Sequence, residues 1–280
     1  MYKKRAVSRR TCARNIYYNL GMNPLIPLGA LLVGIVLIIF GLIKRGSANE
    51  YKAIPCSPIT GLRDEERAFI TGTATSPVHT RAPVSGESCV FYLEVVDRVH
   101  RDHGGRSGSM GHNHKSRVSE KAYGGFLVKD GSGSALVVPH YGTLDLNKPE
   151  TVKDDSLIDT DGSMTRTESV INEGETVTVL GRPRPLSDFM RYMRGNSGLD
   201  IPAAFLEQLL KLEAGEEGSS MMCFFGQGVE KVSDVAHADY VAGTANSASF
   251  LLKLGAALAV SGAGFFLYLL KAAAPDTSGL

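Results

Sequence analysis

The stretch Leu25–Ile43 (LIPLGALLVGIVLIIFGLI) is nineteen residues long and contains no charged side chain. At about 1.5 Å per helical residue it would extend over about 28 Å, close to the roughly 30 Å of bilayer hydrocarbon. A second apolar run, Leu254–Leu270, lies near the other end of the chain. We therefore expect two transmembrane helices, at residues 24–45 and 248–271, that flank a more polar domain.

Basic residues predict how these helices are oriented. The tail of residues 1–23 has no acidic residue and contains six basic ones: Lys3, Lys4, Arg5, Arg9, Arg10 and Arg14. Because Lys and Arg next to a span tend to remain in the cytoplasm, we expect an integral two-pass protein with cytoplasmic N and C termini. The domain would then lie on the exoplasmic or periplasmic side, and residues 272–280 would form a short tail. Lys44 and Arg45, at the domain side of the first span, argue for the reverse orientation.

Two features of the apolar runs leave alternatives open. A cleaved signal peptide is the alternative for the first run, but Lys44–Ala48 contains no clean small-residue cleavage site. An uncleaved anchor is the better interpretation. In the second run Gly255, Ala259 and Ala263 recur at a spacing of four. This small face indicates a helix contact, with the first run or with another copy, unless Ala and Gly merely fill a generic span.

The composition leaves room for one domain, residues 46–247, without a strong charge bias. The chain of 280 residues contains 30 basic and 29 acidic side chains, so no nucleic-acid partner is expected. Four cysteines are present, and none forms a C-x-x-C pair: Cys12, Cys56, Cys89 and Cys223. Disulfide pairing among the last three cannot be read from the sequence.

The domain is predicted to be α+β and mainly β, a compact barrel-like or sandwich fold with one packed helix. Apolar or alternating runs predict strands at Ala68–Thr75, Cys89–Val99, Phe126–Lys129, Ala135–Val138, Glu175–Leu180, Met221–Phe225 and Val229–Val232. Gly-rich turns at Asp130–Gly133 and Gly226–Gly228 predict hairpins. A helix is expected at Ala203–Ala214 with Asp200 as its N-cap, and a shorter one at Ser187–Met193.

Two stretches of the domain are expected to be solvated insertions. Residues 101–119 are rich in Gly, Ser, His and basic side chains, and residues 146–167 are acidic and lack periodicity. Neither stretch has enough apolar content to order itself alone.

The first insertion and its flank contain the candidate metal ligands. Four imidazoles fall within fifteen residues: His100, His103, His112 and His114. Imidazole is a ligand that Zn²⁺, Ni²⁺ and Cu²⁺ accept, so a divalent metal is the one cofactor considered. The alternative is a flexible loop with exposed, uncoordinated imidazoles. A Ca²⁺ loop at Asp159–Glu168 is a near miss, because Leu157 stands where the first carboxylate should be. No signature nominates a catalytic residue.

Three segments resemble a known domain family. Glu66–Tyr92 (ERAFITGTATSPVHTRAPVSGESCVFY) contains a strand with Gly-Thr-Ala, then Ala-Pro, Ser-Gly and Cys-Val-Phe-Tyr, and Phe126–Asp130 and Glu173–Gly181 follow downstream. In this order they resemble the GIDE domain, also called the BAM ("beside a membrane") domain, over about residues 60–240. The resemblance implies a domain between two spans that faces away from the cytosol.

The same domain occurs in the mitochondrial and chloroplast membrane-anchored RING E3 ubiquitin ligases and in simpler prokaryotic membrane proteins. Resemblance to the ligases would imply a C-terminal cytosolic RING, which needs eight Cys or His ligands for two Zn²⁺ ions. Lys271–Leu280 contains neither Cys nor His. We therefore expect a RING-less, prokaryotic-type member without ubiquitin-ligase activity.

The expected function is that of a non-enzymatic sensor, adaptor or binding module beside the membrane. Its expected partners are the lipid bilayer and a protein or peptide. Two alternatives stay open: an enzyme or metal-binding protein that acts through the His-rich insertion, and a subunit of a larger membrane complex that uses its spans as contacts.

Overall fold

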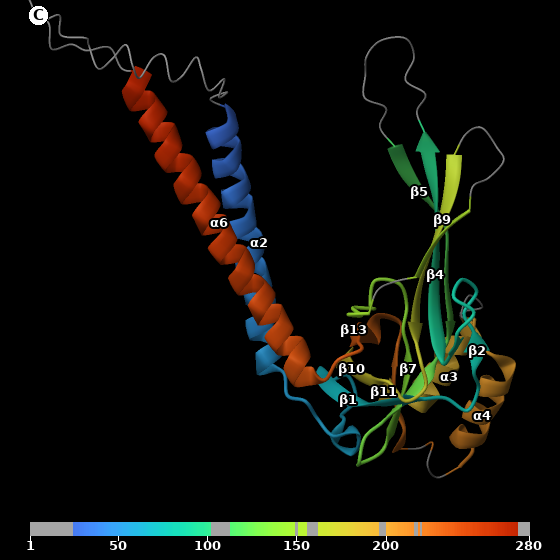
Figure 1. Ribbon diagram of the computed structural model, residues 1–280. Coiled ribbons are helices and arrows are strands. Elements are labelled where there is room, and N and C mark those ends of the chain that lie inside the picture. The colour runs from blue at the N-terminus through green and yellow to red at the C-terminus, as the bar shows by residue number, and fades with distance from the viewer. Residues whose placement is uncertain are drawn as a thin grey trace, which may run out of the picture. The chain divides into compact units, whose positions relative to one another are not determined.

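The chain consists of two compact units (Figure 1). The structure, a computed structural model, describes residues 25–101, 113–148, 151–155, 162–195, 200–215, 218 and 220–273. One unit contains residues 1–53 and 241–280, and the other contains residues 54–240. Each unit has its own packing.

The first unit is formed by two long helices, α2 (Leu25–Ala53) and α6 (His237–Ala273). The first four residues of α6 belong to the second unit. By length and composition both helices are able to cross a membrane. Each helix is longer than its apolar run, because the polar residues that flank the runs continue the helical backbone.

The two helices pack antiparallel through small residues that recur every seven positions. The buried residues of α2 are Pro27, Gly34, Gly41 and Ala48, and those of α6 include Ala248, Gly255 and Gly262. A Cβ at Gly34 would lie 2.5 Å from the amide nitrogen of Ala259, so the two backbones approach as closely as glycine allows. The sequence left open whether the small face of the second run contacts the first run or another copy of the chain, and the structure shows the contact with the first run. Its spacing of seven is the period of a left-handed coil.

The second unit is built on an open seven-stranded sheet. Its strands are β1 (Ala68–Thr75), β6 (Phe126–Lys129), β7 (Ser134–Val138), β10 (Thr176–Gly181), β11 (Arg184–Pro185), β12 (Met222–Phe225) and β13 (Val229–Ser233). The spatial order is β11-β12-β7-β6-β1-β10-β13. All neighbours are antiparallel except β12 and β7, which are parallel.

A four-stranded antiparallel sheet faces the first. Its strands are β4 (Phe91–Arg101), β5 (Asn113–Gly124), β8 (Thr151–Asp155) and β9 (Gly162–Ile171), in the order β5-β4-β9-β8. Strands β4, β5 and β9 extend well beyond the body of the unit (Figure 1). A small ribbon of β2 (Thr80–Arg81) and β3 (Ser88–Cys89) and two short 3₁₀ turns, η1 (Ile59–Gly61) and η2 (Gly226–Gly228), complete the β part.

The main hydrophobic core lies between the two sheets. Strand β4 contributes Phe91, Leu93 and Val95, and the larger sheet contributes residues such as Ile70 and Val179. Successive residues of a strand point to opposite faces, so one face of β4 is apolar along the body of the unit. The second unit is therefore a sandwich of two sheets.

Two helices cover the outer face of the larger sheet. They are α3 (Leu186–Gly195) and α4 (Ala203–Glu213). In β7, Leu136 and Val138 pack with the helices while Ala135 and Val137 enter the main core. Phe189 of α3 and other buried side chains of both helices complete this second cluster. This is why β7 is apolar without alternation.

The predicted fold class is confirmed: an α+β unit rich in strands, flanked by two long apolar helices. It is a sandwich, and no closed barrel is formed in the part of the chain that the structure describes. The hairpin predicted at Gly226–Gly228 is wrong, because β12 pairs with β7 and β11 while β13 pairs with β10. The predicted N-cap is also wrong, since Pro202 precedes α4 without a side-chain cap.

The stretches expected to be solvated insertions instead contribute strands. Residues 113–119 belong to β5, 151–155 to β8 and 162–167 to β9. Their order comes from backbone pairing on either side of β4 and not from burial of apolar side chains, which is why composition did not reveal it. Residues 102–112 and 156–161 lie outside the described residues.

Candidate functional site

A buried carboxylate holds the turn that carries the Ala-Pro and Ser-Gly pairs. Glu168, on β9, is 1% exposed. Its carboxylate accepts hydrogen bonds from the backbone amides of Val84 (2.6 Å) and Ser85 (3.0 Å). These bonds explain how a charged group is accommodated in the interior. Glu168 would be the last ligand of the Ca²⁺ loop considered above, but its carboxylate is already hydrogen-bonded to this turn.

A second carboxylate organises the turn between β6 and β7. Asp130 accepts hydrogen bonds from the amides of Ser132 (2.6 Å), Gly133 (2.8 Å) and Ile59 (2.9 Å), and from the Ser132 hydroxyl (2.6 Å). Partial burial acts to raise the pKa of Asp130, but these hydrogen bonds outweigh it and the pKa lies below its usual value. Asp130 therefore ties η1 to the hairpin in its ionised form.

The thiols of the second unit are free, and two of them are buried. Burial raises the pKa of Cys89 to about 11, with the nearby Glu168 and Glu87 carboxylates acting in the same direction. Burial also raises the pKa of Cys223 far above its usual value. Only the thiolate is nucleophilic, so neither residue is suited to covalent catalysis. Cys56 is exposed.

Only two of the four histidines proposed as metal ligands lie among the residues that the structure describes. His100 and His114 are directly opposite one another in the pairing of β4 and β5, whereas His103 and His112 lie outside the described residues. Within the described residues, no group of three or more His, Cys, Asp and Glu side chains is placed to hold a metal ion. Metal binding at the register pair of His100 and His114 stays a prediction.

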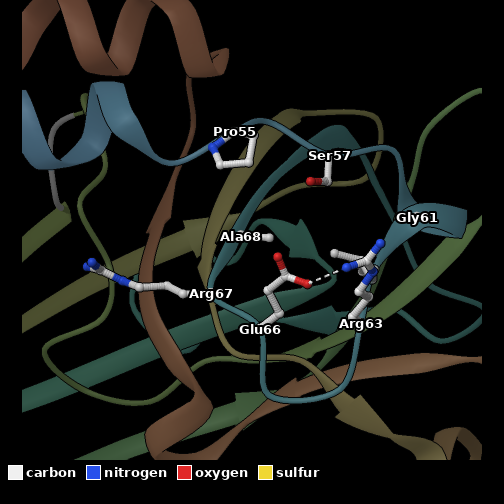
Figure 2. Close-up of a pocket in the computed structure, with 8 residues that line it drawn as sticks. Pro55, Ser57, Gly61, Arg63, Glu66, Arg67 and Ala68 are labelled. Atoms are coloured by element: carbon white, nitrogen blue, oxygen red, sulfur yellow. Dashed lines mark ion pairs between the residues drawn. The ribbon is translucent and has the colours of Figure 1, made fainter.

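A surface hollow of about 210 Å³ lies in residues 55–68, where the chain leaves α2 and enters β1 (Figure 2). Its charged side chains are already neutralised. Arg63 lies 3.7 Å from Glu66, as Figure 2 shows, and Arg67 makes a close ion pair with Glu230 at 2.6 Å. The hollow offers neither a free charge nor an enclosed apolar surface, so we assign it no ligand.

The most distinctive surface of the chain is the outside of the α2–α6 pair. Its exposed large side chains include Leu32, Val36 and Phe40 on α2, and Phe250 and Val260 on α6. Only 17% and 11% of the most apolar windows of the two helices are buried. The arrangement reverses that of a water-soluble helix pair, since small residues lie inside and large apolar ones lie outside.

No protein-family model matches this chain, and no curated protein or solved structure matches it either. What the chain does has to be inferred from its own geometry. The sequence indicated the apolar surface and the histidines, and it placed Asp130 in a turn and Glu168 at the end of an incomplete Ca²⁺ loop, but it did not reveal which backbone amides these two carboxylates bind. Each carboxylate binds at least one backbone amide that is more than 70 residues away in the sequence.

Proposed function

We propose that this chain is a two-pass membrane protein of the GIDE/BAM type whose strand-built unit acts as a binding module beside the bilayer. The observation that carries the proposal is the reversed polarity of the helix pair. Leu, Ile, Val and Phe side chains cover its outside, while glycine and alanine fill its contact. In water such a surface would be costly, at about 25 cal/mol per Å² of apolar area, whereas lipid tails cover it without cost.

A buried core helix and a cleaved signal sequence are also long and apolar, but both fit these helices less well. A core helix of a water-soluble protein would be mostly buried, which neither α2 nor α6 is. A signal sequence removed after export would leave α6 without the partner that its backbone contacts at Gly34. The close packing of the two helices supports permanent anchors.

Membrane integration and orientation are tested together by labelling thiols in intact cells. We propose that Cys12 lies in the cytoplasm and that the exposed Cys56 lies on the exoplasmic or periplasmic side. A membrane-impermeant maleimide should then label Cys56 in intact cells and Cys12 only after lysis. Labelling of Cys12 alone in intact cells would reverse the orientation, and release of the chain by alkaline carbonate would end the proposal of two spans.

The strands that extend beyond the sandwich support a protein or peptide as the binding partner. Strands β5 and β8 form the two edges of their sheet, so each has one strand neighbour among the described residues. An open edge can accept an extended peptide as a further strand. We propose that a partner on the same side of the membrane binds along β5, where Val118 is 52% exposed.

Site-specific photo-crosslinking tests this edge. A photoreactive residue at Val118 should give one reproducible adduct in membranes, and the same residue at Leu210 on α4, which is 46% exposed, should give none. Equal adducts at both positions, or none at Val118, would count against binding along β5.

The register pair His100 and His114 supports a second candidate function, divalent-metal binding on the extended sheet. The two residues are register partners on adjacent antiparallel strands, and imidazole is a ligand that divalent transition metals accept. Titration of the purified full chain with Zn²⁺ should show binding that is lost in H100Q/H114Q and kept in the control H79Q/H140Q. Absence of heat at tens of micromolar Zn²⁺ would exclude this function.

A further inference from the structure

The charges of the helix unit are strongly unbalanced. Its described residues include one carboxylate, Glu50, and five cations: Lys44, Arg45, Lys52, Lys253 and Lys271. Four of these cations lie toward the end at which α2 and α6 continue into residues 54–240, which we call the linker end. Counted within the helix unit, the linker end is therefore basic.

Three of these cations have no counter-ion in the part of the chain that the structure describes. Lys44, Arg45 and Lys253 are exposed and enter no ion pair. By comparison, two half-buried cations of the second unit are paired: Arg67 lies 2.6 Å from Glu230 and Lys148 lies 2.8 Å from Glu175. We call Lys44, Arg45 and Lys253 the basic collar.

The packing of the two helices brings the collar to nearly one level. Gly41 contacts Leu252, so Lys253 lies one residue deeper than this contact and Lys44 lies three residues nearer the linker end. At about 1.5 Å per residue, the difference is about 6 Å, which a Lys side chain can extend across to reach the headgroups.

The collar also surrounds the helix pair. Lys44 and Arg45 follow Gly41 by three and four residues, so they flank the contact line on α2. Lys253 precedes the buried Gly255 by two residues and faces away from α2. The three cations therefore point to separate lipid neighbours and not into one pocket.

We propose that the basic collar binds the phosphate headgroups of anionic phospholipids in the leaflet next to the strand-built unit. The inference rests on the proposed membrane function and names the lipid class that the linker end selects. Arg45 offers a planar fork that matches a phosphate, and Lys44 and Lys253 offer mobile point charges. An attractive surface charge is worth up to about fivefold in lipid association for each basic residue engaged.

The test uses the full chain in phosphatidylcholine vesicles that contain spin-labelled phosphatidylglycerol or, separately, spin-labelled phosphatidylcholine. The ratio of the two motionally restricted fractions gives the selectivity for the anionic lipid. We compare the native chain with the collar variant K44Q/R45Q/K253Q and with the tail variant R9Q/R10Q/R14Q. The tail variant removes the same number of charges at the other end of the first helix.

The native chain should prefer phosphatidylglycerol several-fold, and the preference should weaken in high salt. A loss of selectivity for phosphatidylglycerol that is larger in the collar variant than in the tail variant supports the proposal. The proposal is overturned if both variants lose the same selectivity, or if the tail variant loses more. It is also overturned if the native chain withstands alkaline carbonate but shows no preference for phosphatidylglycerol. A native chain that carbonate strips from the vesicles instead defeats the proposed membrane function itself.

Discussion

The Glu168 side chain is accommodated in the interior because two backbone amides donate hydrogen bonds to its carboxylate. The turn of residues 82–86 directs the amides of Val84 and Ser85 toward the buried Glu168 carboxylate, which accepts a hydrogen bond from each. A carboxylate that accepts two amide hydrogen bonds balances its own desolvation. The turn and the strand β9 are thereby fixed to one another.

Removing this charge should destabilise the strand-built unit. In Glu168→Gln, the amide side chain has one acceptor oxygen where the carboxylate has two, so one backbone amide is left unpaired in the interior. We expect a loss of about 1–3 kcal/mol in the free energy of unfolding. Denaturant unfolding of the full chain in mild detergent, followed by circular dichroism, measures it.

The matched control is Glu87→Gln, directly after the same turn, where the side chain is exposed. This substitution should change stability by less than about 0.5 kcal/mol. If the two variants were equally stable, the hydrogen bonds of Glu168 would contribute nothing to the fold.

Asp130 makes stability depend on pH. Its pKa is lowered in the folded state relative to the usual value of 3.8, because the hydrogen bonds it accepts favour the ionised form. A lowered folded-state pKa gives stability that is present above the unfolded-state pKa and lost as the pH falls through the folded-state value. Asp130→Asn should therefore be less stable at pH 7 and lose less stability than the native chain between pH 5 and pH 3. Unfolding curves across that range test this, and parallel pH profiles would contradict it.

At the scale of elements, α2 and α6 pack closely because their contact contains no large side chain from α2. Every buried residue of α2 is Pro, Gly or Ala, so the helices approach backbone to backbone. Dispersion contacts replace the hydrophobic effect between helices in lipid, and they need this close approach. The contact is therefore sensitive to any added side-chain volume.

The substitution Gly34→Leu should separate the two helices. A Cβ there would lie 2.5 Å from the Ala259 nitrogen and 2.8 Å from the Gly255 carbonyl oxygen, both backbone atoms that cannot move aside. We expect a cost of about 1–3 kcal/mol or more from overpacking, seen as a lower unfolding temperature of the full chain in detergent. Gly29→Leu, on the same helix with nothing within 4 Å of its Cβ position, should leave that temperature nearly unchanged. Equal effects at both positions would mean that the helices are not in contact there.

At the scale of the whole molecule, the chain divides its apolar residues between two environments. Residues 54–240 enclose a core between two sheets and a second cluster under α3 and α4. The helix pair exposes its large apolar side chains instead. The two units therefore differ in where their large apolar side chains lie: inside the strand-built unit and on the surface of the helix pair.

This division predicts that residues 54–240 fold without the helices. Expressed alone, the fragment should stay in the supernatant after centrifugation and unfold cooperatively, because its apolar side chains are buried within the unit. Far-ultraviolet circular dichroism dominated by strand, with one unfolding transition, would bear this out. An aggregated or unfolded fragment would show that the core depends on the long helices.

The amino-acid sequence alone determined the two apolar helices, most strand positions, α3 and α4, because length, hydrophobicity and alternation are local properties. Only the tertiary structure decided that β12 (Met222–Phe225) pairs with β7, that polar residues 113–119 form a strand, and that Gly34 and Gly255 meet. The same holds for Glu168, which is 84 residues from the Val84 amide that it binds. Each of these interactions involves a backbone group whose partner lies in another element, and backbone groups are chemically the same in nearly every residue, so the side-chain pattern of the sequence does not reveal the pairing.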